Sequence, residues 1–225
     1  MKLPLMTGLL CAAALGVGGC SSNVTQPDEY SGFLKDYSRL KESRSPSGVE
    51  VMNWIDPKLD VNQYSRVYIE PTQFYPKPQP TDKIPQKTLS AITQYYDQAL
   101  KRELSKSLPL ADGPGPGVVV VRAAITAVSS KTEGLKAYEI IPVALVAAAV
   151  STASGIRDQE TTLATEAVFL DGSSNTVVAQ VVRKGTGKPL ENDSQVMTAN
   201  DVKNVIDSWA SDLHQSYLKL KAKGR

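Results

Sequence analysis

The sequence feature that most constrains the fold is an alternating apolar run at residues 118–128. Every second residue from 119 to 127 is apolar, and the positions between them include Arg122 and Thr126. This two-residue period is typical of a β-strand with one face in the core, because successive side chains of a strand point to opposite faces. We expect this strand near the centre of a sheet whose apolar face other elements must cover.

Two further segments have the three- and four-residue apolar spacing of amphipathic helices. The first is residues 86–108, where Leu89 and Ile92 begin the apolar stripe, and the second is residues 201–220, whose stripe includes Trp209. Both are long enough to span a sheet. We expect them to cover the apolar face of the strand described above.

Additional strands are predicted on either side of these helices. Residues 64–70 alternate in polarity, and residues 161–170 and 176–184 flank a Gly- and Asn-containing turn that is typical of a hairpin. Residues 49–54 alternate weakly, as an edge strand does. The fold class expected is α+β: a mixed four- to five-stranded sheet with two long amphipathic helices packed on one face, in the order β-α-β-insert-β-β-α.

The first twenty residues have the organisation of a bacterial secretory signal. Lys2 gives a positive start, residues 9–17 are apolar, and small residues follow. The apolar stretch is too short to span a hydrocarbon core of about 30 Å. It ends in the pattern of a lipobox, an aliphatic residue and two small residues before a cysteine: Val17, Gly18, Gly19 and Cys20.

This pattern predicts cleavage before Cys20 and the attachment of a diacylglycerol and an N-acyl chain such as palmitate to its thiol. Cys11 is a rival acceptor, although bulky Leu10 precedes it, and an ordinary cysteine near a cleavage site is the remaining alternative. Ser21 stands where an aspartate would favour retention in the inner membrane. We therefore expect a lipid-anchored protein on the periplasmic face of the outer membrane.

The predicted organisation has three parts. Residues 1–19 are a lipoprotein signal peptide, and residues 20–48 are the lipidated cysteine, a flexible tether and a short docking helix. The docking helix rests on the helical spacing of apolar residues within 30–40. Residues 49–225 are a single globular periplasmic domain with an apolar insert at 138–156.

This insert contains eleven successive residues, 140–150, without a charge or a side-chain hydrogen-bonding group. A helix of that length reaches only about 16 Å and cannot span a bilayer. It is either a short Ala-rich helix that covers part of the sheet or an exposed surface that meets a partner or lipid. A proline-rich loop with two aromatic residues could also bind a glycan or peptide by stacking. The candidate interaction surface is Val143, Leu145, Val146, Ala147, Val150, Phe74 and Tyr75.

Chemistry-bearing residues are scarce. His214 is the single histidine and has no ligand set around it in the sequence, so we expect no metal site. Cys11 leaves with the signal and Cys20 becomes a thioether, which excludes thiol chemistry in the mature chain. The run Gly185-Thr-Gly-Lys188 lacks the glycine and hydroxyl residue of a phosphate loop. We therefore predict no catalytic residues, no cofactor other than the covalent lipid, and no enzyme activity.

One stretch resembles a known family. Residues 32–40, GFLKDYSRL, look like the opening motif of proteobacterial lipoproteins known as domain of unknown function 3313. A Trp or Tyr segment and a strand that ends in a proline-rich stretch follow in that family, as Trp54 and residues 64–76 do here. The resemblance covers residues 32–220 and implies a location but no activity. The order of elements is also similar to periplasmic domains related to the curli secretion channel, which assemble into rings.

These observations predict a non-enzymatic lipoprotein that binds or helps assemble another envelope component, through a protein partner or self-assembly. The alternative is a cell-wall-directed hydrolase or carbohydrate-binding lipoprotein with Phe74 and Tyr75 at its site. A formal net charge of +2 gives no electrostatic footprint for nucleic acid, so we expect no nucleic-acid partner.

Overall fold

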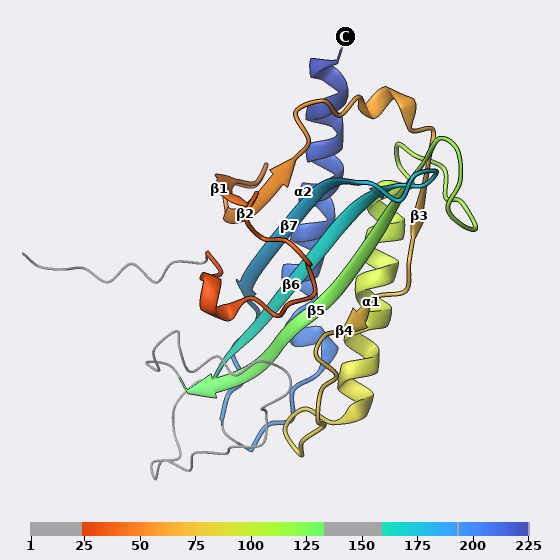
Figure 1. Cartoon of the computed structure of the whole chain (residues 1–225). Coiled ribbons are helices and arrows are strands. Elements are labelled where there is room, and N and C mark those ends of the chain that lie inside the picture. The colour runs from red at the N-terminus through yellow and green to blue at the C-terminus, as the bar shows by residue number, and fades with distance from the viewer. Residues whose placement is uncertain (1–23, 133–158, 193, 225) are drawn as a thin grey trace, which may run out of the picture.

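The computed structural model describes residues 24–132, 159–192 and 194–224, and it places two helices on one face of a seven-stranded mixed sheet (Figure 1). The predicted α+β class is confirmed. The strands are β1 (Lys41–Arg44), β2 (Glu50–Ile55), β3 (Arg66–Ile69), β4 (Gln73–Phe74), β5 (Val118–Thr132), β6 (Gln159–Asp171) and β7 (Val177–Thr186). The helices are α1 (Gln86–Leu104) and α2 (Lys203–Lys223), with short 3-10 turns η1 (Pro27–Glu29), η2 (Val61–Gln63) and η5 (Ala199–Asp201).

The sheet runs in the order β1-β2-β7-β6-β5-β3, and β4 also pairs with β5. The strands β3 and β4 are parallel to β5, whereas the other neighbours are antiparallel. Because β5 has partners along both of its edges, the prediction that residues 118–128 form a central strand is confirmed.

The predicted count of four to five strands and the predicted order β-α-β-insert-β-β-α are both wrong, because β1 and β4 add to the sheet and four strands precede α1. The sequence of β1 is KESR, which has no apolar alternation, and β4 contains only two residues within the proline-rich loop. Such strands pair through their backbone groups, and their sequences have no alternation of apolar and polar residues that would predict a strand. The predicted edge strand at 49–54 is instead β2, which lies between β1 and β7.

Both predicted helices are present on one face. Their apolar stripes pack against the sheet in one cluster, in which Ile92, Ile206 and Leu163 have no exposed surface. Helix α1 ends at Leu104 rather than at 108, and the following residues close in turns such as the bond from the Ser107 amide to the Leu104 carbonyl. These three-residue bonds tighten the end of the helix.

The opposite face of the sheet is covered by residues 24–40, named the strap from here on. Figure 1 shows the strap crossing the near face of the sheet while the helices lie behind it. Leu34 and Leu40 are buried there against a cluster that includes Val120 and Val168. The strap contains turns and no α-helix, so the short helix predicted within 30–40 is wrong. Gly32 takes a positive φ of 87°, which interrupts a helix at its start.

A buried carboxylate holds the strap on the sheet. Glu166 of β6 is 1% exposed and accepts hydrogen bonds from the Ser31 amide (2.8 Å), the Leu34 amide (3.2 Å) and the Tyr37 hydroxyl (2.6 Å). Because the strap is neither helix nor strand here, its amides need such partners when they are buried. Burial, together with the neighbouring Glu166 carboxylate, raises the pKa of Tyr37, so its hydroxyl stays protonated as a donor.

The folded domain begins ahead of its predicted boundary at 49. The strand β1 belongs to the same sheet as β5, and the strap packs on that sheet from Val24 onward. The predicted signal peptide (1–19), Cys20 and the insert at 138–156 lie outside the described residues. Within the described part of the chain, no helix is both long and apolar enough to cross a membrane.

Candidate functional site

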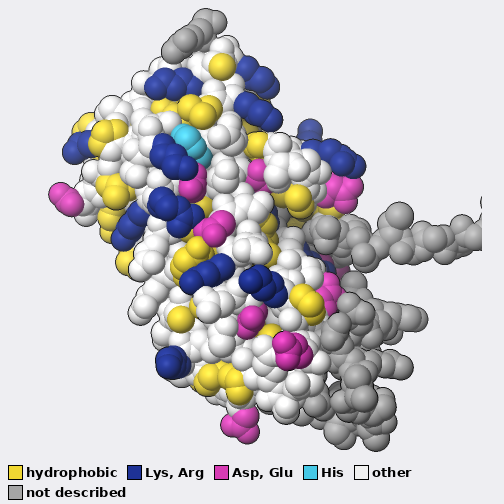
Figure 2. Space-filling view, turned by 180° about the vertical axis from the view of Figure 1, so that it is seen from behind, with side chains coloured by type: hydrophobic (Ala, Val, Ile, Leu, Met, Phe, Trp, Pro, Cys, Tyr) yellow, Lys and Arg dark blue, Asp and Glu magenta, His cyan; other side chains and the backbone are white. Residues whose placement is uncertain are grey.

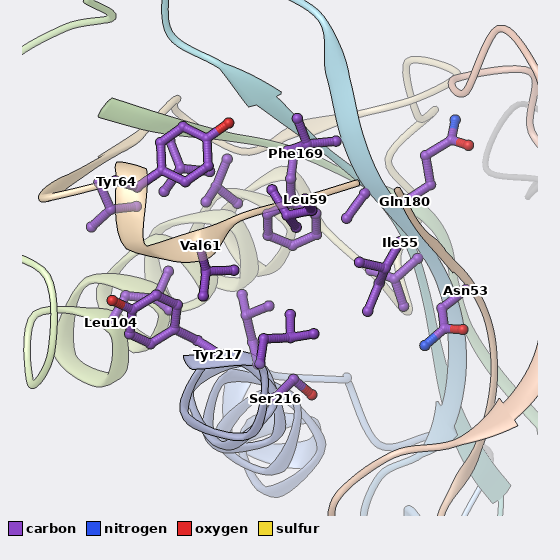
Figure 3. A pocket seen from close by; sticks show the side chains of 18 of the residues that line it. Asn53, Ile55, Leu59, Val61, Tyr64, Leu104, Phe169, Gln180, Ser216 and Tyr217 are labelled. Carbon is purple, nitrogen blue, oxygen red and sulfur yellow. The ribbon is translucent and has the colours of Figure 1, made fainter. Parts of the chain in front are cut away.

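An apolar cleft of about 120 Å³ opens between α2, the sheet and the connection from β2 to β3 (Figure 3). The connection contains η2 and places Leu59 and Val61 beside the cleft. The side of the cleft formed by α2 includes Leu213, Tyr217 and Leu220. Most of the lining is therefore aliphatic or aromatic, as in sites that bind apolar ligands.

The floor of the cleft is a row of side chains that crosses four strands. Val121 of β5 pairs with Phe169 of β6, Phe169 pairs with Ala179 of β7, and Ala179 pairs with Ile55 of β2. All four residues line the cleft. Directly paired residues of neighbouring strands project from the same face of a sheet, so the row is continuous. Ala179, with a single side-chain carbon, lies between the larger Phe169 and Ile55 and gives the cleft its depth.

The cleft stays open because the helices end at different levels. Figure 1 shows that α2 extends beyond the end of α1. Leu104 at the end of α1 and Leu108 just after it reach the edge of the cleft, but in the described chain no second α-helix lies beside the last turns of α2, where the short η2 is the neighbour. Val119, Phe169 and Val181 beneath this gap are consequently only half-buried, whereas the neighbouring core residues are fully covered.

A buried ion pair borders the cleft. Arg183 of β7 lines the cleft, and its Nη1 lies 3.3 Å from Oδ2 of Asp212 on α2, with side-chain exposures of 9% and 5%. Asp212 also accepts hydrogen bonds from the amide and hydroxyl of Ser47, both at 2.9 Å. Burial lowers the pKa of Arg183, while the Asp212 carboxylate acts in the opposite direction. The pair is neutral as a whole, so it brings no net charge to the cleft.

The rim of the cleft includes Tyr64, which is uncharged at neutral pH. The Tyr64 hydroxyl donates a hydrogen bond to Oδ2 of Asp171 at 3.1 Å. Burial and the negative charge of Asp171 raise the pKa of Tyr64 from 10.0 to about 12. Figure 3 shows the rings of Tyr64 and Tyr217 beside the cleft, together with Phe169 of its floor. The arrangement suits an apolar, uncharged group rather than an anion or a cation.

The single histidine links α2 to the turn that follows α1. Its Nε2 lies 2.8 Å from Oγ of Ser107, and His214 is 8% exposed. Such a pair resembles a nucleophile and its base, but neither residue lines the cleft. No carboxylate in the described part of the chain bonds the other ring nitrogen. Nor do the described residues include a group of three His, Cys, Asp or Glu side chains suited to a metal ion.

The residues that the sequence singled out do not meet at this cleft. Phe74 packs against Ala127 and Ala164, and Tyr75 is 40% exposed with its ring 5.7 Å from the ring of Phe33. Neither lines the cleft. The candidate residues Val143, Leu145, Val146, Ala147 and Val150, and the lipobox residues Val17, Gly18, Gly19 and Cys20, lie outside the described residues.

The cleft itself was missed by sequence reasoning. Alternation marks Phe169 and Ala179 only as residues on the core-facing side of their strands. Whether other elements cover a core-facing residue depends on where α1 ends and on the path of η2. Neither feature can be predicted from the sequence pattern around that residue. The sequence therefore contained no direct signal for the cleft.

Two solved structures are among those to which this chain is similar. The PelC dodecamer from Paraburkholderia phytofirmans has 13% identity, with 72% of this chain and 96% of that chain covered and a TM-score of 0.39. A putative neuraminyllactose-binding hemagglutinin homolog from Helicobacter pylori has 10% identity, with 72% and 84% covered and a TM-score of 0.40.

Two sequence relatives are much closer. The uncharacterized lipoproteins YdcL of Escherichia coli strain K12 and of Escherichia coli O157:H7 are each 41% identical over 211 residues. That match covers 94% of this chain and 93% of each relative. The model of the family described as protein of unknown function (DUF3313) matches residues 29–213, and the chain therefore belongs to that family.

Proposed function

We propose that this chain is a non-enzymatic lipoprotein, anchored through Cys20 to the periplasmic face of the outer membrane, whose cleft binds an alkyl group of another envelope component. The observation that carries the binding role is the apolar cleft between α2 and the sheet. An alkyl group is proposed because the lining is apolar and the ion pair at its border is neutral.

The anchor rests on two independent observations. The sequence before Cys20 has the small residues of a lipobox, and the relatives with 41% identity are lipoproteins. The choice of the outer membrane rests on Ser21 at the position where aspartate favours the inner membrane. Two or three acyl chains hold such a protein firmly, since each buried methylene contributes about 0.8 kcal/mol.

The size of the cleft sets the expected affinity. An alkyl end of about five methylenes, each contributing about 0.8 kcal/mol, gives about 4 kcal/mol, which corresponds to a dissociation constant of about 1 mM. Binding of this strength becomes useful when both molecules are confined to the same envelope, because tethering raises the effective concentration. A weak, reversible contact with a second tethered component fits these numbers.

The alternative of a cell-wall hydrolase or carbohydrate-binding protein has less support. Phe74 faces Ala127 and Ala164, and Tyr75 packs on Phe33, so the two rings do not form a free stacking platform.

Figure 2 shows basic and acidic side chains interspersed over the helix-covered face, which is not the single-sign patch that binds nucleic acid.

The binding role can be tested by filling the cleft. Using a chain that begins at residue 21, saturation-transfer NMR with 1-hexanol should detect binding to the unchanged domain and to the surface control Ala222→Trp. Ala179→Trp places a large ring in the centre of the floor and should weaken binding by about tenfold or more. Equal binding by Ala179→Trp and Ala222→Trp would contradict the proposed role of the cleft.

The anchor requires a separate test. Cys20→Ala should abolish incorporation of labelled palmitate and leave an unprocessed or soluble chain, whereas Cys11→Ala should be labelled normally. Labelling that persists in Cys20→Ala would refute the anchor without affecting the binding result.

A further inference from the structure

The strap is fixed to the domain from its first described residue. Val24 and Thr25 are 7% and 4% exposed. The η1 turn follows, closed by a bond of 2.7 Å from the Gln26 amide to the Glu29 carboxylate. Glu29 then pairs with Lys184 of β7 at 2.8 Å, with both side chains 12% exposed. The flexible tether predicted before residue 30 is therefore already part of the folded domain at Val24.

Covalent geometry limits the remaining distance to the proposed anchor. Cys20 and Val24 are separated by four Cα–Cα steps of about 3.8 Å, so their Cα atoms are at most about 15 Å apart whatever the intervening path. This is about half the thickness of the hydrocarbon core of a bilayer. A domain on so short a connection cannot move far from the surface in which its acyl chains are inserted.

We propose that the end of the domain formed by η1 and the neighbouring part of β7 lies against the lipid surface and that the cleft opens away from it. This inference rests on the proposed anchor at Cys20. The exposed residues of the membrane-facing end are Gln26, Pro27 and Asp28. The strap covers one face of the sheet and α2 lies on the other (Figure 1). The cleft is lined by residues of α2 and therefore lies on the face opposite the strap.

The same geometry places the basic end of α2 far from the anchor. Gly185, next to Lys184, packs so closely on Val205 and Trp209 that an added Cβ would meet both. The anchored end of the domain is therefore beside the first half of α2. From Trp209 to Lys223 the helix rises by about 21 Å, at about 1.5 Å per residue. Lys219 and Lys223 at the far end are therefore not the membrane contact in this arrangement.

The orientation can be measured with the lipidated chain in vesicles. Because the mature chain keeps no free thiol, Gln26→Cys and Ala222→Cys each offer one labelling position, both exposed. A fluorophore at each is compared in phosphatidylcholine vesicles with and without spin-labelled headgroups. We expect quenching several-fold stronger at position 26 than at position 222. Equal quenching, or stronger quenching at position 222, would overturn the orientation.

Two further measurements separate this inference from the anchor itself. Flotation of the same samples with vesicles reports the anchor alone, so a chain that floats but shows reversed quenching refutes only the orientation. A chain that does not float refutes the anchor, and with it the orientation. Insertion of a long Gly-Ser linker between Ser22 and Asn23 should keep flotation while reducing quenching at position 26, because flexible linkers lengthen the reach. Unchanged quenching after this insertion would contradict control by the short connection.

Discussion

The two faces of the sheet are covered in different ways. On one face, α1 and α2 bury apolar stripes and satisfy their own backbone hydrogen bonds, as amphipathic helices do. On the other face, the strap has turns and no α-helix, and two of its amides bond to the side chain of Glu166. Both faces combine apolar contact with a buried carboxylate, but the partners differ: Asp212 of α2 pairs with the Arg183 side chain, whereas Glu166 bonds to the backbone of the strap.

This difference explains where an opening can exist. Helices are straight rods of fixed length, so a gap remains where α1 ends and α2 continues, and the cleft occupies that gap. An irregular segment follows the surface beneath it and leaves less space, but it needs a polar partner for its backbone. The helix-covered face therefore has space for an apolar group, whereas the strap-covered face depends on a polar partner for its backbone.

The largest effect is expected from the ion pair on the helix-covered face. Asp212→Ala leaves Arg183 buried without its carboxylate and removes the acceptor of Ser47, so we expect a loss of about 3–5 kcal/mol in the free energy of unfolding. Asp207→Ala is the matched control, because Asp207 lies on the same helix but is 41% exposed, and it should cost about 1 kcal/mol or less. Urea unfolding measures both; similar small losses would mean that the pair is not structurally important.

A somewhat smaller loss is expected on the strap-covered face. Glu166→Ala removes the acceptor of three hydrogen bonds at about 1 kcal/mol each, so stability should fall by about 3 kcal/mol. Trypsin should then cut faster within the strap, at Lys35 or Arg39, while α2 stays protected. Glu160→Ala, an exposed change on the same strand, should alter neither quantity. Protection of the strap in Glu166→Ala would show that apolar contact alone holds it.

Filling the cleft should raise stability slightly. Ala179→Leu adds apolar groups to open space between Phe169 and Ile55, and cavity-filling changes of this kind contribute about 0.5–2 kcal/mol. Ala222→Leu on the exposed end of α2 should have no such effect. A destabilised Ala179→Leu variant in thermal unfolding would mean that the floor is already packed and that the cleft is too small to bind a ligand.

The smallest effect is confined to alkaline solution. The pKa of Tyr64 is raised to about 12 by burial, so the folded chain keeps a proton that the unfolded chain releases near pH 10.0. The stability from this residue is complete below pH 10 and is lost as the pH rises toward about 12. Tyr64→Phe should make the free energy of unfolding fall less steeply over that window. An unchanged slope in urea titrations at several pH values would count against a buried, neutral Tyr64.

Local patterns were sufficient for the elements that cover the core. The alternation at 118–128 and the helical spacing around Leu89 and Trp209 each correspond to an element of the structure. The reason is that the apolar face of a helix or strand is formed by residues a few positions apart in the sequence. The same reasoning failed for residues 30–40. There the apolar spacing is helical, but Gly32 and the contacts with Glu166 favour turns.

By itself, the sequence determined the family, the lipobox before Cys20 and the succession of helix and strand, since each depends on residues that lie close together in the chain. Only the tertiary structure decided the strap and the cleft. Tyr37 meets Glu166 across 129 positions, and Ile55 meets Ala179 through the pairing of β2 with β7. Such contacts form only when distant segments have folded together, so no pattern of neighbouring residues predicts them.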